Sequence, residues 1–155
     1  MGAVTYSSGN VISLLNDEVV PVQLPHDILP ESKTYNVKWT PAMYVLDPTG
    51  LEHHSIVGFL PPEEFIPFVI LGIAKAYFDL DKFDEALAHF EKVVEDYPQS
   101  SSAPEAVYLR GVTHYKIEHT VDGLVGAYET LQRDYPGTIW ASRSEPYRLL
   151  KEAAA

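Results

Sequence analysis

The chain has 155 residues, of which 46% are hydrophobic and 21% are charged, proportions that fit one ordinary globular domain or two small ones. Its 22 acidic and 11 basic residues give a formal net charge of −11, which argues against nucleic acid or an anionic membrane surface as a partner. The absence of cysteine excludes disulfides, thiolate metal sites and cysteine nucleophiles.

The sequence gives little information about location. No apolar run approaches the ~20 residues that a membrane-spanning helix needs, so no membrane partner is expected. Neither a charged-then-apolar signal peptide nor a myristoylation pattern is present. A mature secreted chain would look the same, so the compartment stays open, with the cytoplasm favoured.

The first elements in chain order are short. The run from Asn10 to Asn16 predicts a short helix with Asn10 as its N-cap. The β-branched stretch from Val19 to Leu24 predicts a strand. Pro21 places that strand at an edge or an irregularity, because proline cannot donate to a ladder. A short helix has room after Pro30.

A β-hairpin is the next expected element. Ala42 to Leu46 has the composition of a buried strand, and Glu52 to Val57 that of its partner. The Asp-Pro-Thr-Gly sequence from Asp47 to Gly50 is typical of the tight turn that joins two such strands. Gly58 closes the segment, and a helix is expected to start near Pro62.

The remaining two thirds are predicted to be helical and repetitive. Asp96-Tyr97-Pro98 recurs 38 residues later as Asp134-Tyr135-Pro136. An apolar stripe at helical spacing precedes each tripeptide, and each of these helices has an upstream partner, roughly Pro62 to Leu80 and Pro104 to Glu118. A helix pair that repeats at this period predicts a stacked helical array.

This pattern resembles the tetratricopeptide repeat. Counting back from the two prolines, the eight marked positions of that family fall on Ile70, Ile73, Ala74, Tyr77, Ala86, Phe90, Val93 and Pro98, and on Tyr108, Gly111, Val112, Tyr115, Leu124, Tyr128, Leu131 and Pro136. The second unit departs from the pattern, because Leu124 replaces a small residue and four residues, Gln99 to Ser102, lengthen the connection.

The resemblance implies a ligand groove along the first helix of each unit. The positions that would line it hold Phe68, Leu71, Lys75, Phe78, Asp79, Ala106, Leu109, Thr113 and Lys116. Lys75 and Lys116 could meet an acidic chain end, although the Lys/Asn set of chaperone-tail-binding members is not reproduced. An equally strong alternative is that these residues pack on the front segment.

The front segment resembles the second half of a thioredoxin-like domain. The similarity covers roughly residues 3–80, and its signature runs from Tyr35 through Trp39-Thr40-Pro41 and the predicted hairpin to Val57-Gly58. It implies a cis peptide bond between Thr40 and Pro41, a loop of Trp39, Thr40 and Pro41 that can hold a peptide backbone, and a helix after the glycine.

The family's first strands and its C-x-x-C dithiol are missing from the chain. Redox activity therefore does not carry over, because no other side chain replaces the attacking thiolate. The missing strand would leave backbone groups of its neighbours unpaired. The remaining strands are therefore expected either to pair with each other or to pair across a homodimer. A related expectation is that a C-x-x-C half lies upstream of this chain.

Histidines and carboxylates offer no obvious reactive cluster. His53 and His54 are adjacent on a strand and are expected to point to opposite faces. His114 and His119 are five residues apart on a helix, and not the four that would align two ligands. Carboxylate pairs such as Glu63-Glu64 lie where a helix begins and are expected to be solvated. We expect no metal, no cofactor and no catalytic constellation.

Together these patterns predict an α+β chain, with an incomplete thioredoxin-like βαββα segment at residues 3–60. An all-α array at residues 61–152 follows it, with two tetratricopeptide-like helix pairs and a C-terminal capping helix. The helix at 62–80 is shared by both parts. The expected function is a non-catalytic scaffold that binds a protein or peptide. The alternative is a fragment of a thiol–disulfide oxidoreductase.

Overall fold

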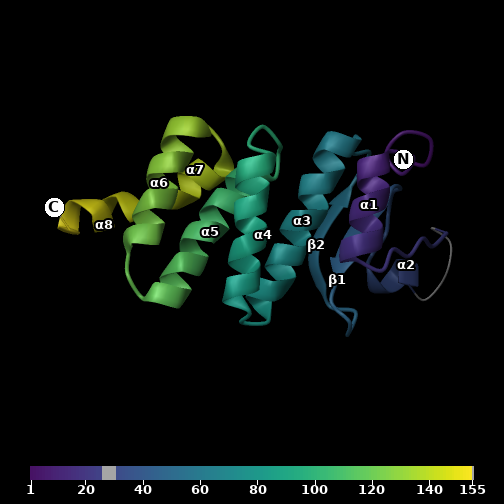
Figure 1. Cartoon of the computed structure of the whole chain (residues 1–155), viewed down its shortest axis with the longest axis horizontal. Helices are drawn as coiled ribbons and strands as arrows, with labels where there is room; N and C mark the ends of the chain where they lie inside the picture. The colour runs from purple at the N-terminus through teal and green to yellow at the C-terminus, as the bar shows by residue number, and fades with distance from the viewer. Residues whose placement is uncertain (26–30, 155) are drawn as a thin grey trace.

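The computed structural model describes residues 1–25 and 31–154 and shows a mostly helical chain with one small antiparallel sheet (Figure 1). Helices α3 to α6 lie side by side in a row, with α1 and the hairpin at one end and the C-terminus at the other. The elements in chain order are α1 (Gly9–Glu18), α2 (Glu31–Thr34), β1 (Ala42–Leu46), β2 (Glu52–Val57), α3 (Pro62–Asp79), α4 (Phe83–Asp96), α5 (Ala103–Glu118), α6 (Asp122–Asp134), α7 (Ile139–Ser144) and α8 (Tyr147–Ala154).

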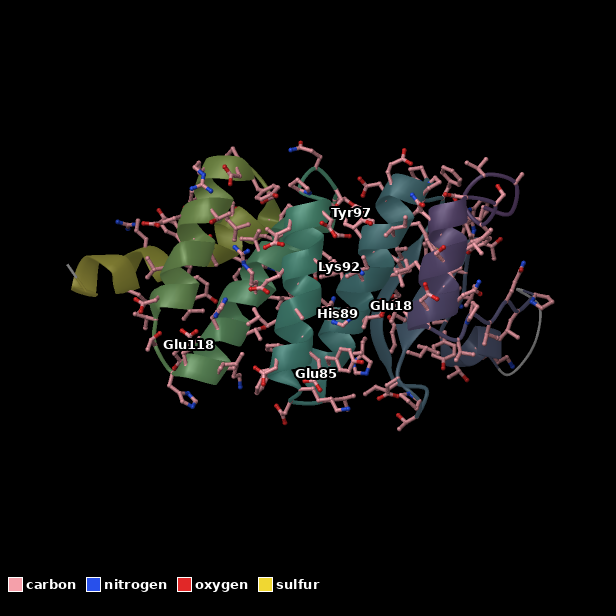
Figure 2. All side chains as sticks on the ribbon, in the orientation of Figure 1. Glu18, Glu85, His89, Lys92, Tyr97 and Glu118 are labelled. Carbon is pink, nitrogen blue, oxygen red and sulfur yellow. The ribbon has the colours of Figure 1, made fainter. Side chains whose placement is uncertain are left out.

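Helix α1 is longer than the sequence predicts and starts earlier. Ser8, and not Asn10, is the N-cap residue. Val11 and Leu14 are buried and place α1 against α3, as the helical spacing predicts. At its other end Glu18 reaches towards α4, where His89 Nε2 lies 4.0 Å and Lys92 Nζ 3.9 Å from its carboxylate (Figure 2).

The strand predicted from Val19 to Leu24 is wrong. This stretch forms no ladder, and its apolar side chains after Val19 are open to solvent, with exposed fractions of 89% for Val20 and 74% for Val22. A strand must pair its backbone groups with a neighbour, Pro21 has no N–H to give, and no described strand lies beside it. Pro30 lies outside the described residues, and the short helix expected after it is α2.

The β-hairpin forms as predicted. β1 and β2 pair antiparallel, with Met43 opposite Ile56 and Val45 opposite His54. Asp47 fixes the turn, because its carboxylate oxygen Oδ1 accepts hydrogen bonds from the backbone N–H groups of Thr49 (2.8 Å) and Leu51 (3.1 Å). The register shifts between Val45 and Leu46, next to this turn.

Helix α3 is the central element of the molecule. Pro62 occupies its first turn, where a missing N–H costs nothing, and Glu63 and Glu64 follow at the positive end of the helix dipole. It contacts α1, both strands and α4, and its apolar residues form one core with theirs. At Gly72 a Cβ would meet Val45 at 2.5 Å, so only glycine permits this approach of helix and hairpin.

Helices α4 to α7 continue the array as antiparallel neighbours. Phe90 and Val93 of α4 are fully buried, as are Val107 of α5 and Leu131 of α6. The repeated tripeptides end α4 and α6, and the hydroxyl of Tyr135 in the second donates to the carbonyl of Pro98 in the first, at 2.8 Å. The C-terminal part is two short helices, α7 and α8, where the sequence predicts one. No helix among the described residues is long and apolar enough to cross a membrane.

Candidate binding site

Helices α3 and α5 carry most of the residues predicted to line a groove. An ion pair joins the two helices directly, with Lys75 Nζ of α3 lying 2.8 Å from Glu105 Oε1 of α5. Both side chains are largely buried, with exposed fractions of 25% and 16%. This pair therefore ties α3 to α5.

The hairpin covers the first half of the α3 face. Phe68 and Leu71 are buried, and the imidazole of His54 stacks on the Phe68 ring with centroids 4.5 Å apart. Ala106 of α5 is also fully buried. These three predicted groove positions therefore belong to the core and do not form a free surface.

Lys75 is held from the hairpin side as well. Its ammonium lies 3.1 Å from Nδ1 of His54, in addition to the bond with Glu105. Burial, and to a smaller extent the positive charge of Lys75, lower the pKa of His54 to about 4. His54 is therefore neutral at ordinary pH and can accept a hydrogen bond from Lys75.

Asp79, the last residue of α3, binds the other hairpin histidine. Its carboxylate lies 2.6 Å from Nδ1 of His53, whose Nε2 lies 3.3 Å from the carboxylate of Asp47. Burial alone would lower the pKa of His53, but the hydrogen bonds and charges of Asp79 and Asp47 outweigh it and raise the pKa above its usual range. The pKa of Asp47 is lowered to about 2, chiefly by the hydroxyl of Thr49.

The sequence predicts that His53 and His54 point to opposite faces of the strand. This prediction is wrong, because both side chains contact α3. His54 reaches Phe68 and Lys75, and His53 reaches Asp79. The register shift beside the turn interrupts the strict alternation of side chains along β2 and accounts for the difference.

The C-terminal ends of α3 and α5 carry an aromatic and cationic cluster. Phe78 is half-buried and meets Phe83 of α4 edge-on, with ring centroids 5.5 Å apart. The ammonium of Lys116, which is exposed, lies 5.8 Å from the centroid of the same Phe83 ring. Phe78, Phe83 and Lys116 remain within reach of a partner, and we call them the Phe78 cluster.

Two further predicted groove residues, Leu109 and Thr113, lie on α5 outside the Phe78 cluster. Leu109 is half-buried and packs against the core. Thr113 is fully buried, and its hydroxyl donates to the carbonyl of Leu109 at 2.7 Å. Thr113 is therefore a buried residue of α5 whose hydroxyl bonds within its own helix, and it is not available to a ligand.

The loop of Trp39, Thr40 and Pro41 is a separate surface. Thr40-Pro41 is a cis peptide bond, and Trp39 is 73% exposed. The carbonyl of Pro41 accepts from the N–H of Gly58 at 2.8 Å, which places the loop at the open end of the hairpin. His53 and Asp79 meet at the turn end, so the two predicted sets lie at opposite ends of the hairpin.

Several contacts were not predicted from the sequence. His53, His54, Glu105 and Phe83 all touch the predicted groove residues, and each belongs to an element other than α3. Helical spacing could have placed Glu105 on the same face of α5 as Leu109, but the hairpin histidines give no such signal. In the part of the chain that the structure describes, no three His, Asp or Glu side chains converge as metal ligands would.

The profile of the tetratricopeptide repeat family matches residues 69–100, which span most of α3, all of α4 and the turn after it. The chain contains a tetratricopeptide repeat. This repeat is the helix pair that the first Asp-Tyr-Pro tripeptide closes, and α5 and α6 extend it into a helical array. Neither the curated proteins nor the solved structures contain a match to the chain. Tetratricopeptide repeats typically mediate protein–protein interactions and are generally non-catalytic.

Proposed function

We propose that the chain is a non-catalytic scaffold that binds an extended segment of a partner protein across α3 and α5. The observation that carries this proposal is the tetratricopeptide repeat at residues 69–100 within a row of packed helices. The helices of such a row are already packed and ordered, so binding a peptide does not require free energy to order the scaffold itself.

The Phe78 cluster is the proposed anchor. An aromatic pair with a cation beside it is the kind of feature that supplies much of the binding energy at protein interfaces. Lys75 and Asp79 lie next to Phe78 on α3 and are already bound by His54, Glu105 and His53. We assign them a positioning role beside Phe78, with the half-buried Leu109 of α5 as a further apolar contact.

Selection from a random peptide library tests this function. We expect enriched peptides to lose at least about tenfold in affinity with Phe78→Ala or Lys116→Ala, the scale of a modest interface anchor. Arg133→Ala is the matched control, because Arg133 is exposed on α6 and forms its salt bridge with the neighbouring Asp134. Peptides that bind equally well to all three variants would contradict the proposed surface.

The alternative function, a fragment of a thiol–disulfide oxidoreductase, is a second proposal. The hairpin followed at once by α3 has the element order that the thioredoxin-like resemblance implies, and the Trp39–Pro41 loop would hold substrate there. The exposed Val20 and Val22 are compatible with a strand that pairs elsewhere. The genomic DNA upstream of this chain should then encode an in-frame C-x-x-C, and its absence would rule the alternative out.

A homodimer through the incomplete sheet is a further proposal about partners. It is supported by the apolar side chains that the first 60 residues leave exposed, among them Val20, Leu24 and Val57. Light scattering should then give twice the monomer mass, and Val20→Lys should halve it. A monomeric mass for the unmodified chain would contradict the dimer.

A further inference from the structure

The contact between the hairpin turn and the end of α3 depends on a histidine that bridges two carboxylates. Asp47 comes from the turn and Asp79 from the last turn of α3, and the side chain of His53 between them is only 1% exposed. The groups that face His53 are these two carboxylates alone among the described residues. Lys75, one turn earlier on α3, faces His54 instead.

The two halves of this bridge are not equally fixed. Oδ1 of Asp47 is already tied into the turn by the N–H groups of Thr49 and Leu51, so Asp47 and His53 move together with the hairpin. The bond that joins the turn to α3 is the one between His53 and Asp79, at 2.6 Å. Asp79 is half exposed, with a side-chain fraction of 52%, so water can replace this bond when it breaks.

The charge of the imidazole decides the strength of that bond. A protonated ring donates from both nitrogens, one to each carboxylate, whereas a neutral ring has one N–H and leaves one carboxylate without a donor. The C-terminal end of α3 adds partial negative charge beside Asp79, which further favours a cation there. His54 behaves differently, because it is neutral and its contact with Lys75 does not require a proton.

We propose that His53 is a proton-dependent latch, which holds the hairpin turn most tightly on the end of α3 when protonated and holds it more weakly, so that the turn opens more often, when neutral. His54 and Val45 keep the middle of the hairpin on α3 in both states, so the opening is confined to the turn end. Release frees Asp79 beside the Phe78 cluster. This consequence for ligand access rests on the proposed binding function, whereas the latch itself does not.

The sign of the pH dependence follows from the raised pKa of His53. Its contribution to closing is fully present below about pH 6.5, the value for an unperturbed histidine, and is lost as the pH rises through the folded pKa. Each unit by which the pKa is raised corresponds to about a tenfold change in the equilibrium between the closed and open turn.

Nuclear magnetic resonance on the full chain tests the latch. The Cε1 proton of His53 should titrate with a midpoint above 6.5, and the amide protection factors of Glu52 and His53 should fall several-fold between pH 6 and pH 8.5. Amides in α5 provide the internal reference and should keep their protection. Asp79→Asn should lower the His53 midpoint and remove most of the change in protection, whereas His114→Gln, at a half-buried position of α5 where the imidazole pairs with Glu118, should leave both unchanged.

Two results would overturn the latch. One is a His53 midpoint at or below 6.5, and the other is a turn whose protection does not change while His53 titrates. Neither readout involves a ligand, so failure of the latch is distinguishable from failure of the proposed binding function.

Discussion

The helical array and the first 60 residues differ in how completely they cover their apolar side chains. Of the fifteen large hydrophobic side chains that are exposed among the described residues, ten lie in the first 60 residues, although these make up less than half of the chain. Helices satisfy their own backbone groups and need only side-chain packing, which the antiparallel neighbours provide. A strand needs a neighbour, and the Val19–Leu24 stretch has no strand beside it in the described part of the chain.

The largest difference between the two regions should appear when one large hydrophobic side chain in each is replaced by alanine and the free energy of unfolding is measured. Phe90→Ala removes a side chain with no exposed surface in α4, and we expect it to lower the free energy of unfolding by about 3–5 kcal/mol. Val20→Ala removes a side chain that is 89% exposed in the single chain and should change the free energy of unfolding of the monomer by less than about 0.5 kcal/mol. Chemical denaturation measures both. Equal effects would show that the exposed stretch is buried in solution.

Glycines in the array give a more local comparison. Gly111→Ala would place a Cβ 2.5 Å from both the Ala127 side chain and the Gly123 carbonyl, and should destabilise the α5–α6 contact by about 1–3 kcal/mol. Gly126→Ala on α6 meets open space and should stabilise by about 0.5–1 kcal/mol, because glycine is a poor helix former. Thermal unfolding of the two variants should shift in opposite directions, and a shared sign would contradict the packing of α5 on α6.

Acid should weaken the attachment of the hairpin through His54. Because burial lowers its folded pKa to about 4, the neutral ring contributes stability above about pH 6.5 that is lost as the pH falls towards 4. His54→Gln should remove roughly 1–2 kcal/mol of the pH dependence of unfolding over this interval. Denaturation curves at several pH values measure it. An unchanged pH dependence in the variant would contradict a neutral His54.

The smallest expected effect on stability is at the proline loop. Trp39→Ser removes a side chain that is 73% exposed, so the free energy of unfolding should change by less than about 0.5 kcal/mol. Binding of a hydrophobic dye should nevertheless decrease, because the surface loses a large exposed aromatic side chain. A marked loss of stability would show that Trp39 packs against the hairpin.

The sequence predicts those elements that depend on residues close together in the chain, and it fails where an element depends on a distant partner. The helical spacing and the Asp-Pro-Thr-Gly turn are local signals, and they give α3 to α6 and the hairpin nearly to the residue. Val19 to Leu24 has strand composition, but strand formation depends on a distant partner that composition does not reveal.

The candidate site shows the same division. The position of Lys75 and Phe78 on one face of α3 follows from helical periodicity, whereas their partners come from other elements. Contacts between Lys75 and His54, and between Asp79 and His53, depend on how the hairpin seats on α3. The register shift that aims both histidines at one helix leaves no local pattern in the sequence.

The most direct test of the scaffold is to map where a selected peptide binds, by following backbone amide signals as the peptide is added. The account predicts that the signals of Phe78, Phe83 and Lys116 shift together, with saturation at one peptide per chain. Shifts confined to the first 60 residues, or a library that yields no peptide, would contradict recognition by the helical array.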